Sequence, residues 1–363
     1  MRKAKLFSVI LIFALVITAA IPSIAYAAEG GALSMLTRTE LDKIDEVVRQ
    51  NMSEGKIPGL SLVVVSGDEI LYSNGYGYAD VENKKSVTMD TVFELGSNSK
   101  AFTGLAMLKL EKEGLVNFSD PVEKYIPWFE VRYSGQKVTV TVEQVMNHTS
   151  GIPFSSIDKI PESDSDTALE DTVRTLVGSG LQTRPGENYS YATINYDILG
   201  LIIEITTGHS YEEYISRNIL EPIGLRNTYM FSRDASAELA RGYKVGFLSA
   251  RGYDAPVYRG NKPAGYILIN GNDAAKWMMT QLGNNSESVF DHELIEKSHE
   301  FLKASFANDV SYTAGWFVNG FTGEVFHGGG NPNFSSHIIL DTKTGIGVAA
   351  LTNMGSSPFP MDA

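Results

Sequence analysis

Apolar positions are spaced differently along the chain, and the spacing predicts different elements at its start, middle and end. Between Leu41 and Met52 apolar residues recur every three or four positions, which predicts an amphipathic helix. Two short apolar runs follow at 60–65 and 69–77, and the turn residues Ser66-Gly67-Asp68 lie between them. That arrangement is typical of a β-hairpin, so we expect the fold to begin with a helix and two paired strands.

The remaining pattern predicts helices in the middle of the chain and strands near its end. Helical periodicity, interrupted by loops rich in proline and glycine, dominates roughly 101–285. Four further strands are expected at 312–318, 323–327, 335–341 and 345–352. Strands at both ends predict one antiparallel sheet that the two ends of the chain close together. We therefore expect an α/β fold in which helices flank this sheet and an all-helical lobe is inserted into it.

The first residues carry the pattern of a secretory signal peptide. Arg2, Lys3 and Lys5 precede an apolar run over about 6–20, and small residues at 25–27 form a cleavage site. A retained N-terminal anchor is the alternative, but the apolar run is shorter than a full membrane span. We expect cleavage after residue 27 and export of the mature chain.

The expected organisation has four parts. A signal peptide over 1–27 and a small polar tether over 28–38 precede one large folded domain over 39–355. The last residues, 356–363, follow that domain. The mature chain is long enough for one large domain or two closely packed lobes.

Charge and composition exclude several classes of protein. The formal net charge is −13, so the chain has no electrostatic attraction for nucleic acid or for anionic lipid. It contains no cysteine, and its six histidines lack the spacing of metal ligands. We therefore expect no metal, no cofactor, no nucleic-acid partner and no membrane span in the mature chain. Export without cysteine suits a bacterial periplasm, cell envelope or extracellular space, and the oligomeric state stays open.

The most informative pair of residues is Ser97 and Lys100. If a helix begins at the serine, positions three residues apart lie on one face, so the hydroxyl and the amine are neighbours. A lysine held neutral can take the proton of a serine and make it nucleophilic. A serine at this place also serves as an ordinary N-cap, so the pair alone is weak evidence.

Two further motifs suit a serine acyl-transfer site. Tyr191 follows a turn signal, and a phenol whose pKa is lowered by a nearby lysine can relay protons to a leaving group. The alternative role for Tyr191 is that of a core side chain. His327-Gly328-Gly329-Gly330 ends an expected strand, where glycines let a substrate approach and one N–H can face an oxyanion. The alternative for these glycines is a hairpin turn.

Two other segments could be taken for functional motifs, but we interpret both as structural. Asn147-His148-Thr149-Ser150-Gly151 follows a short expected helix at 142–146, and we interpret His148 as structural. Lys343-Thr344-Gly345 spells the K-T-G motif of penicillin-recognising enzymes, but it lies in a polar turn between two apolar strands. We therefore predict a hairpin tip there and place the active-site edge at the His327 segment.

Taken together, these motifs resemble the family of serine β-lactamases and penicillin-binding-protein-like hydrolases, in its class C-like branch. That branch includes esterases and D-amino-acid-directed or prodrug-activating peptidases. The resemblance covers about 41–353 and implies that Ser97 is the acylated nucleophile, with Lys100 and Tyr191 as its acid–base pair. It also implies that His327 replaces the lysine of the third motif, and that the N–H groups of Ser97 and Gly330 bind the oxyanion.

The chain departs from the family pattern in two places. Thr193 occupies the position where the tyrosine motif usually has asparagine, so a short hydroxyl replaces a carboxamide. Asn331, next to the expected oxyanion N–H, is a candidate to bind a polar substrate group, and a turn asparagine is the equal alternative. Family members continue into a further helix after the last strand, so 356–363 is interpreted as a truncated end.

The sequence therefore predicts an exported serine hydrolase that forms an acyl-enzyme. The leading hypothesis is a peptidase or amidase that acts on D-residue-containing or acylated peptides, and the expected partner is a small-molecule or peptide substrate. The alternatives are a carboxylesterase, a penicillin-binding protein or β-lactamase, and an inactive envelope-binding homologue.

Overall fold

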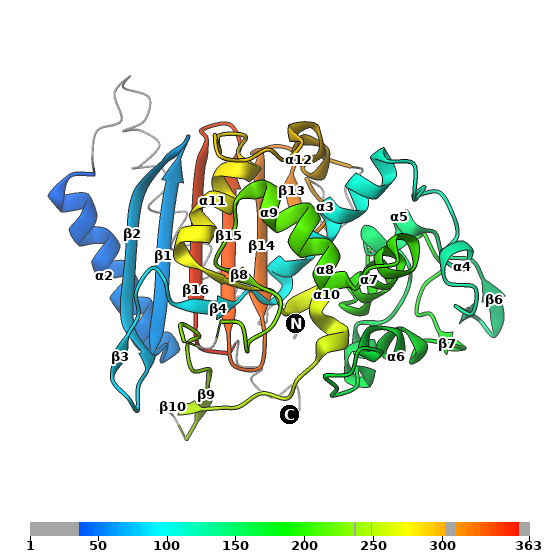
Figure 1. Cartoon of the computed structure of the whole chain (residues 1–363), viewed down its shortest axis with the longest axis horizontal. Coiled ribbons are helices and arrows are strands. Elements are labelled where there is room, and N and C mark those ends of the chain that lie inside the picture. The colour runs from blue at the N-terminus through cyan, green and yellow to red at the C-terminus, as the bar shows by residue number, and fades with distance from the viewer. Residues whose placement is uncertain (1–35, 236, 248, 303–305, 307–308, 356–363) are drawn as a thin grey trace.

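The computed structural model describes residues 36–355 except 236, 248, 303–305 and 307–308. Its centre is an antiparallel sheet of eight strands in the order β12-β13-β14-β15-β16-β1-β2-β3 (Figure 1). The strands are β1 (Gly59–Ser66), β2 (Glu69–Asp80), β3 (Lys85–Ser86), β12 (Val310–Thr313), β13 (Trp316–Asn319), β14 (Glu324–Gly330), β15 (Ser335–Asp341) and β16 (Ile346–Thr352).

The two ends of the described chain meet in the middle of this sheet. β1 pairs with β16 along its length, from Leu60 opposite Thr352 to Ser66 opposite Ile346. β1 also pairs with β2, the other strand of the first hairpin. The predictions of an α/β fold and of an antiparallel sheet closed by both ends of the chain are therefore confirmed.

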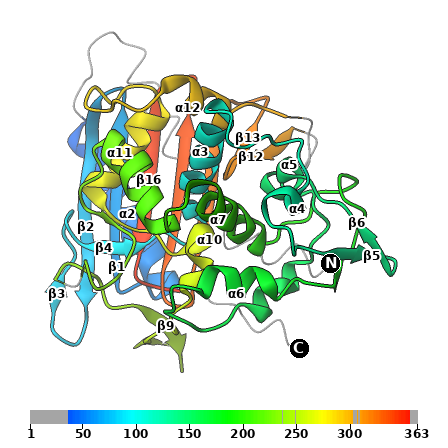
Figure 2. The same cartoon turned by 45° about the vertical axis from the view of Figure 1, so that its right-hand side comes forward.

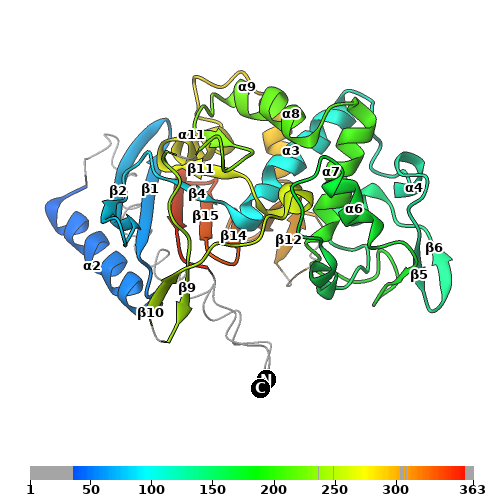
Figure 3. The same cartoon turned by 60° about the horizontal axis from the view of Figure 1, so that its bottom comes forward.

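Helices cover both faces of the sheet because its central strands are apolar on both sides. Leu60, Leu62 and Val64 pack in one cluster with the helix α2 (Arg38–Gly55), whereas Val63 and Val65 belong to the large core on the other face. That other face carries α11 (Gly271–Gln281), α3 (Ser99–Lys112) and α12 (His292–Ser298). Figure 3 shows the sheet lying between α2 and α11.

The middle of the chain forms a lobe beside the sheet (Figure 2). Its longest helix, α7 (Ile194–Thr207), contacts α3, α5, α6 and α10. The helices of this part are α4 (Val122–Tyr125), α5 (Val142–Met146), α6 (Ala168–Arg174), α7, α8 (Tyr211–Ile215), α9 (Glu221–Ile223) and α10 (Lys262–Gly265), with 3₁₀ turns η2 (Phe154–Lys159) and η4 (Arg259–Asn261) and a π-helical turn η3 (Ser216–Leu220).

The expectation of an all-helical lobe is wrong, because the middle of the chain also contains short strands that the helical periodicity did not reveal. β4 (Val92–Glu94), β11 (Leu268–Asn270) and β8 (Thr228–Tyr229) form one small sheet. The others are β5 (Val131–Tyr133), β6 (Gln136–Val138), β7 (Ser179–Gly180), β9 (Tyr243–Gly246) and β10 (Ser249–Gly252). These strands have only two to four residues, too few to show a repeat in the sequence.

Two expected strands have different boundaries. The run 312–318 is a hairpin rather than one strand, because Ala314 and Gly315 adopt positive φ angles of 44° and 92° and turn the chain between β12 and β13. The strand expected at 323–327 continues to Gly330, so the glycine run lies inside β14 and is not a turn. The expected hairpin tip at Lys343 lies, as predicted, between β15 and β16.

Several expectations fall on residues outside the described part. These are the signal peptide over 1–27, most of the tether over 28–38 and the end at 356–363. Among the residues that are described, no helix combines the length and apolar character needed to cross a bilayer.

Candidate active site

Ser97 lies in a 3₁₀ turn, η1 (Gly96–Asn98), between β4 and α3. Gly96 has a positive φ of 53°, and a Cβ atom there would stand 2.4 Å from the backbone nitrogen of Gly330. Only glycine therefore allows the turn to lie this close to β14. Ser97 itself stays partly exposed, so its hydroxyl is accessible at the start of a buried helix.

Lys100 is one turn further along and completely buried. Its Nζ donates hydrogen bonds to Ser97 Oγ at 2.9 Å and to the carbonyl oxygen of Ala264 at 2.7 Å. Burial lowers the pKa of Lys100 to about 7, although the buried carboxyl of Asp197 opposes that shift. A substantial fraction of this amine is neutral near pH 7, as a base for Ser97 requires.

Tyr191 precedes α7 and brings its ring beside Lys100, whose Nζ lies 5.2 Å from the ring centroid. Burial raises the pKa of Tyr191, and the neighbouring Ser97 hydroxyl lowers it only in part. The expectation of a phenol with a lowered pKa is therefore wrong, because desolvation outweighs the effect of the Ser97 hydroxyl. Among the described residues, its buried hydroxyl completes no hydrogen bond of normal geometry. Tyr191 is thus a protonated phenol next to the serine.

The glycines of β14 allow this strand to lie in close contact with η1. A Cβ atom on Gly329 would stand only 1.9 Å from the carbonyl oxygen of Leu95. From the adjacent strand, Ser336 Oγ donates to the same Leu95 oxygen at 2.5 Å and accepts from Asn98 Nδ2 at 2.8 Å. Strands β14 and β15 therefore hold η1 from one side and bring Gly330 next to it.

His327 lies in β14 and is buried. Its Nδ1 is 2.7 Å from the carbonyl oxygen of Gly328, and its Nε2 is 3.1 Å from the Tyr312 hydroxyl. Burial, together with the nearby Lys100, lowers the pKa of His327 to about 3. A neutral imidazole here donates from Nδ1 to the carbonyl and accepts at Nε2. It supplies none of the positive charge that a lysine at this position carries.

The two remaining candidates differ in their surroundings. Thr193 is almost completely buried at the start of α7, and its hydroxyl makes no hydrogen bond to another described residue. The amide nitrogen of Asn331 donates to Glu94 Oε2 at 2.6 Å and to the carbonyl oxygen of Gly265 at 2.9 Å. Both donors of Asn331 are therefore engaged within the protein.

The segment around His148 supports the start of α7. His148 is buried with a positive φ of 56°, and its Nδ1 is the acceptor for Asn195 Nδ2 at 2.9 Å and for the Ala192 N–H at 3.3 Å. Asn195 Oδ1 accepts in turn from Ser150 Oγ at 3.0 Å. The His148 ring lies 4.3 Å from that of Tyr191. These contacts fix the backbone that carries Tyr191, in line with a structural role for His148.

The sequence analysis missed the segment formed by η4 and α10. Three successive carbonyl oxygens of this segment each accept a side-chain hydrogen bond: Pro263 from Thr103 at 2.7 Å, Ala264 from Lys100 and Gly265 from Asn331. Asn261 Nδ2 also donates to Asp197 Oδ2 at 2.7 Å. Nothing in the spacing of these residues marks them, because backbone carbonyls carry no residue-type signal.

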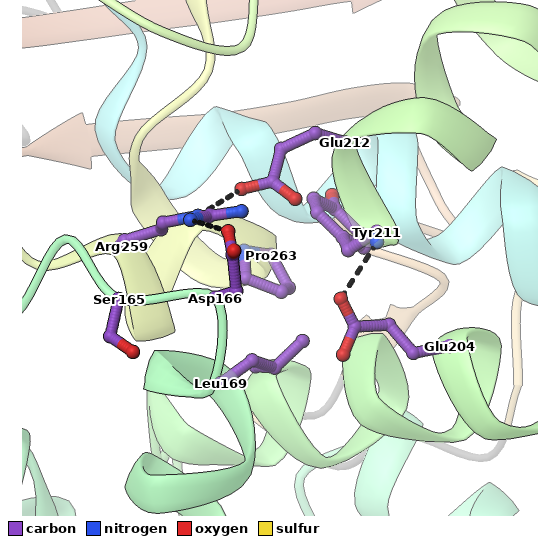
Figure 4. A pocket seen from close by; sticks show the side chains of 8 residues that line it. All are labelled: Ser165, Asp166, Leu169, Glu204, Tyr211, Glu212, Arg259 and Pro263. Atoms are coloured by element: carbon purple, nitrogen blue, oxygen red, sulfur yellow. Dashed lines mark hydrogen bonds and ion pairs between the residues drawn. The ribbon is translucent and has the colours of Figure 1, made fainter. Parts of the chain in front are cut away.

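Ion pairs also hold the segment formed by η4 and α10 in place. Glu212 on α8 pairs with Arg259 at 2.9 Å and with Lys262 at 3.1 Å, and all three side chains are at least 85% buried. Arg259 also reaches the exposed Asp166. Figure 4 shows the Arg259 pairs at the wall of a small pocket that Pro263 also lines. The charges hold η4 and α10 against α8, and thereby hold the Ala264 carbonyl against Lys100.

A serine at the start of a helix, hydrogen-bonded to a lysine of lowered pKa and flanked by a phenol, is an arrangement of the β-lactamase and penicillin-binding-protein type. Comparison with known families gives the same result. The model of the family described as "Beta-lactamase" matches residues 44–363, and the chain belongs to this family.

Individual relatives support that assignment. Protein flp of Staphylococcus aureus (strain N315) is 34% identical over 328 residues, which cover 90% of this chain and 65% of that protein. Penicillin-binding protein 4* of Bacillus subtilis (strain 168) is 27% identical over 300 residues, which cover 77% of this chain and 64% of that protein. The chain thus spans slightly less than two thirds of the length of these relatives.

Solved structures show the same fold. The octameric penicillin-binding protein homologue from Pyrococcus abyssi matches with a TM-score of 0.75 and 30% identity, covering 87% of this chain and 74% of that one. EstCE1, described as a hydrolase with promiscuous acyltransferase activity, matches with a TM-score of 0.73 and 20% identity, covering 87% and 94%. At that identity, EstCE1 is evidence for the fold alone.

Proposed function

We propose that this protein is an exported amidase or peptidase that cleaves acylated or D-residue-containing peptides through an acyl-enzyme on Ser97. The observation that carries the proposal is the contact between Lys100 and Ser97. An amine that is completely buried, 2.9 Å from the hydroxyl and with a pKa of about 7, is matched to proton removal near neutral pH.

The expected reaction has two halves. In the first, Lys100 accepts the Ser97 proton while Ser97 Oγ bonds to the substrate carbonyl carbon, and the oxygen of that carbonyl gains negative charge. The N–H groups of Ser97 and Gly330 stabilise this oxyanion. Tyr191 gives its proton to the leaving nitrogen as the carbon–nitrogen bond breaks, and recovers one from Lys100. In the second half, Lys100 takes a proton from water while the water oxygen bonds to the ester carbonyl carbon, and the bond from that carbon to Ser97 Oγ then breaks as Ser97 recovers the proton from Lys100.

The preference for peptides over β-lactams rests on Thr193. Its hydroxyl has no partner among the described residues and is shorter than the carboxamide that β-lactamases present at this position. We therefore expect slow or absent turnover of nitrocefin, with faster cleavage of an N-acyl-D-amino-acid amide. Fast nitrocefin hydrolysis would contradict this preference, whereas a fast reaction with only a short-chain nitrophenyl ester would favour a carboxylesterase.

Export is supported by the sequence of the first residues. Basic residues, an apolar run and small residues at 25–27 have the order of a secretory signal peptide. Expression of the full chain in a bacterial host and N-terminal sequencing of the product test this proposal. A mature protein beginning at residue 28 would support it, and an uncleaved cytoplasmic protein would contradict it.

Covalent labelling with a fluorophosphonate tests the nucleophile. The wild type is expected to form one adduct, which mass spectrometry maps to Ser97. The Ser97→Ala variant is expected to form no adduct, and its rate of hydrolysis should be lower by at least about 10³-fold. Ser155→Ala is a suitable control because Ser155 is exposed on η2 (Phe154–Lys159). An adduct on another serine would refute the assignment, and an unlabelled wild type would favour an inactive binding protein.

A further inference from the structure

One asparagine side chain connects three segments that each supply a part of the site. The Asn331 amide donates to the Glu94 carboxylate at 2.6 Å and to the Gly265 carbonyl at 2.9 Å. Glu94 ends β4, three residues before Ser97. Asn331 directly follows Gly330, and Gly265 directly follows Ala264, whose carbonyl holds Lys100.

This connection bridges parts of the chain that are far apart in sequence. Glu94 and Asn331 are separated by 237 positions, and Gly265 and Asn331 by 66. Burial raises the pKa of Glu94 to about 7, so its carboxyl is ionised above neutral pH, and the ionised form accepts a stronger hydrogen bond from the amide than a neutral group would. Asn331 is 8% exposed, so water competes little for its donors. The contact therefore restrains the end of β14 relative to the turn that carries the nucleophile.

A second role for Asn331, binding a polar group of the substrate, is harder to reconcile with these contacts. An asparagine amide has two N–H donors, and both are used by Glu94 and Gly265. A substrate acceptor would have to displace one of them and leave the partner unpaired. Such an unpaired buried group is costly, so the internal contacts are favoured.

We propose that Asn331 and Glu94 are positioning residues, which hold the Gly330 N–H at the correct distance from Ser97 for the developing oxyanion. The proposal rests on the proposed function, in which that N–H forms half of the oxyanion site. Donors of this kind act only when their placement is accurate, and a displacement of about 1 Å can lower a rate by roughly 10²-fold.

Three variants test the contact: Asn331→Asp, Glu94→Gln and the double variant. Asn331→Asp removes both amide donors and places a second acidic group against Glu94. At pH 8 to 9, where Glu94 is ionised, we expect kcat for nitrophenyl esters to fall about 10²-fold while KM stays within about twofold. In the double variant the new glutamine can donate to the new aspartate, and we expect at least about tenfold recovery of kcat.

In Asn331→Asp, kcat should fall by the same factor for the acetyl and the butyryl nitrophenyl ester, because both substrates form the same oxyanion. The matched control is Asn83→Asp, which also removes an asparagine donor facing a carboxylate, here Asp80 at 2.7 Å in an exposed turn. It is expected to leave kcat unchanged. A rise in KM that depends on the acyl group would overturn the proposal in favour of substrate binding by Asn331, and no recovery in the double variant would also contradict it.

Hydrogen exchange separates this proposal from the proposed function, since it needs no turnover. Exchange in the peptide covering 327–333 should be at least about tenfold faster in Asn331→Asp than in the wild type, and unchanged in a peptide from α2. This acceleration would support the connection even if Ser97 were not labelled in the wild type, a result that would refute only the acyl-transfer function. Unchanged exchange at 327–333 would overturn the positioning role.

Discussion

The buried Lys100 should make the stability of this protein depend on pH in a way that one substitution removes. Its pKa is lowered from 10.5 to about 7 by burial, a shift that corresponds to about 5 kcal/mol of destabilisation at and below pH 7, where folding buries the charged amine or removes its proton. Lys100→Met keeps a long, flexible side chain but carries no charge. It therefore removes this cost together with the hydrogen bonds that the amine makes.

The net change in the free energy of unfolding depends on the hydrogen bonds that the variant loses. The Ala264 carbonyl, which accepts from Lys100 at 2.7 Å, loses its side-chain donor, and so does Ser97 Oγ at 2.9 Å. Losing these two bonds, one of them at a buried carbonyl, costs about 3 kcal/mol together. Burial raises the pKa of the neighbouring Asp197 carboxyl, so that without the lysine this group stays protonated rather than becoming an unpaired charge. Below pH 7 we therefore expect Lys100→Met to be more stable than the wild type by about 2 kcal/mol, although it should not be labelled by a fluorophosphonate.

The pH dependence follows from the direction of the shift. Since the folded pKa of Lys100 lies below the unfolded pKa, the unfolded chain holds one more proton between about pH 7 and 10.5. Wild-type stability therefore rises with pH in this window, by about 1.4 kcal/mol per pH unit from this group, and Lys100→Met lacks that rise. The advantage of the variant should shrink above pH 7 and change sign by about pH 9.

Urea denaturation followed by tryptophan fluorescence, at several values between pH 6 and 9.5, measures this difference directly. Lys43→Met, at an exposed position of α2, serves as the control and should run parallel to the wild type. Parallel curves for Lys100→Met and the wild type would refute the reasoning, because they would show that Lys100 keeps an ordinary pKa when folded.

Two further predictions concern the proton relay and its support. Tyr191→Phe and Lys100→Ala should each lower the acylation rate by several orders of magnitude, and the double variant should lose little more, because the two groups act as a unit. Single-turnover kinetics with a nitrophenyl ester would measure this, and additive losses would indicate independent roles. Glu212→Gln should destabilise the protein by about 3 kcal/mol, since it leaves two basic side chains without their buried carboxylate. A change in the urea midpoint corresponding to less than about 1 kcal/mol would show that solvent reaches these charges.

The sequence was most informative where side-chain type and periodicity coincide. The strand at 335–341 is observed as β15 (Ser335–Asp341), because an apolar run bounded by polar turns leaves few alternatives. Ser97 and Lys100 could be paired in advance because helical spacing alone brings positions three apart onto one face. The hairpin at Lys343 was recognisable for a similar reason, since a polar turn separates two apolar strands.

The contacts that tune the site could not be anticipated in this way. The pKa of Tyr191 was expected to be lowered by a lysine, but burial, which depends on the packing of distant segments, raises it. Likewise, the glycines of β14 are needed because Leu95 and Gly96 approach them, a contact between residues more than 200 positions apart. Gly265 and Ala264 act through backbone carbonyls, so their sequence positions carry no chemical signal.

The pairing of β1 with β16 has a consequence for the time at which the site can form. Ser97 and Lys100 are synthesised long before Gly330, Asn331 and β16, the strand that pairs with β1. Contacts between such distant segments form late and slowly, because a long loop must close first. An unfinished chain therefore has the nucleophile and its base without the strand that completes the site. If the chain is a hydrolase as proposed, we therefore expect activity only after almost the whole domain has been made.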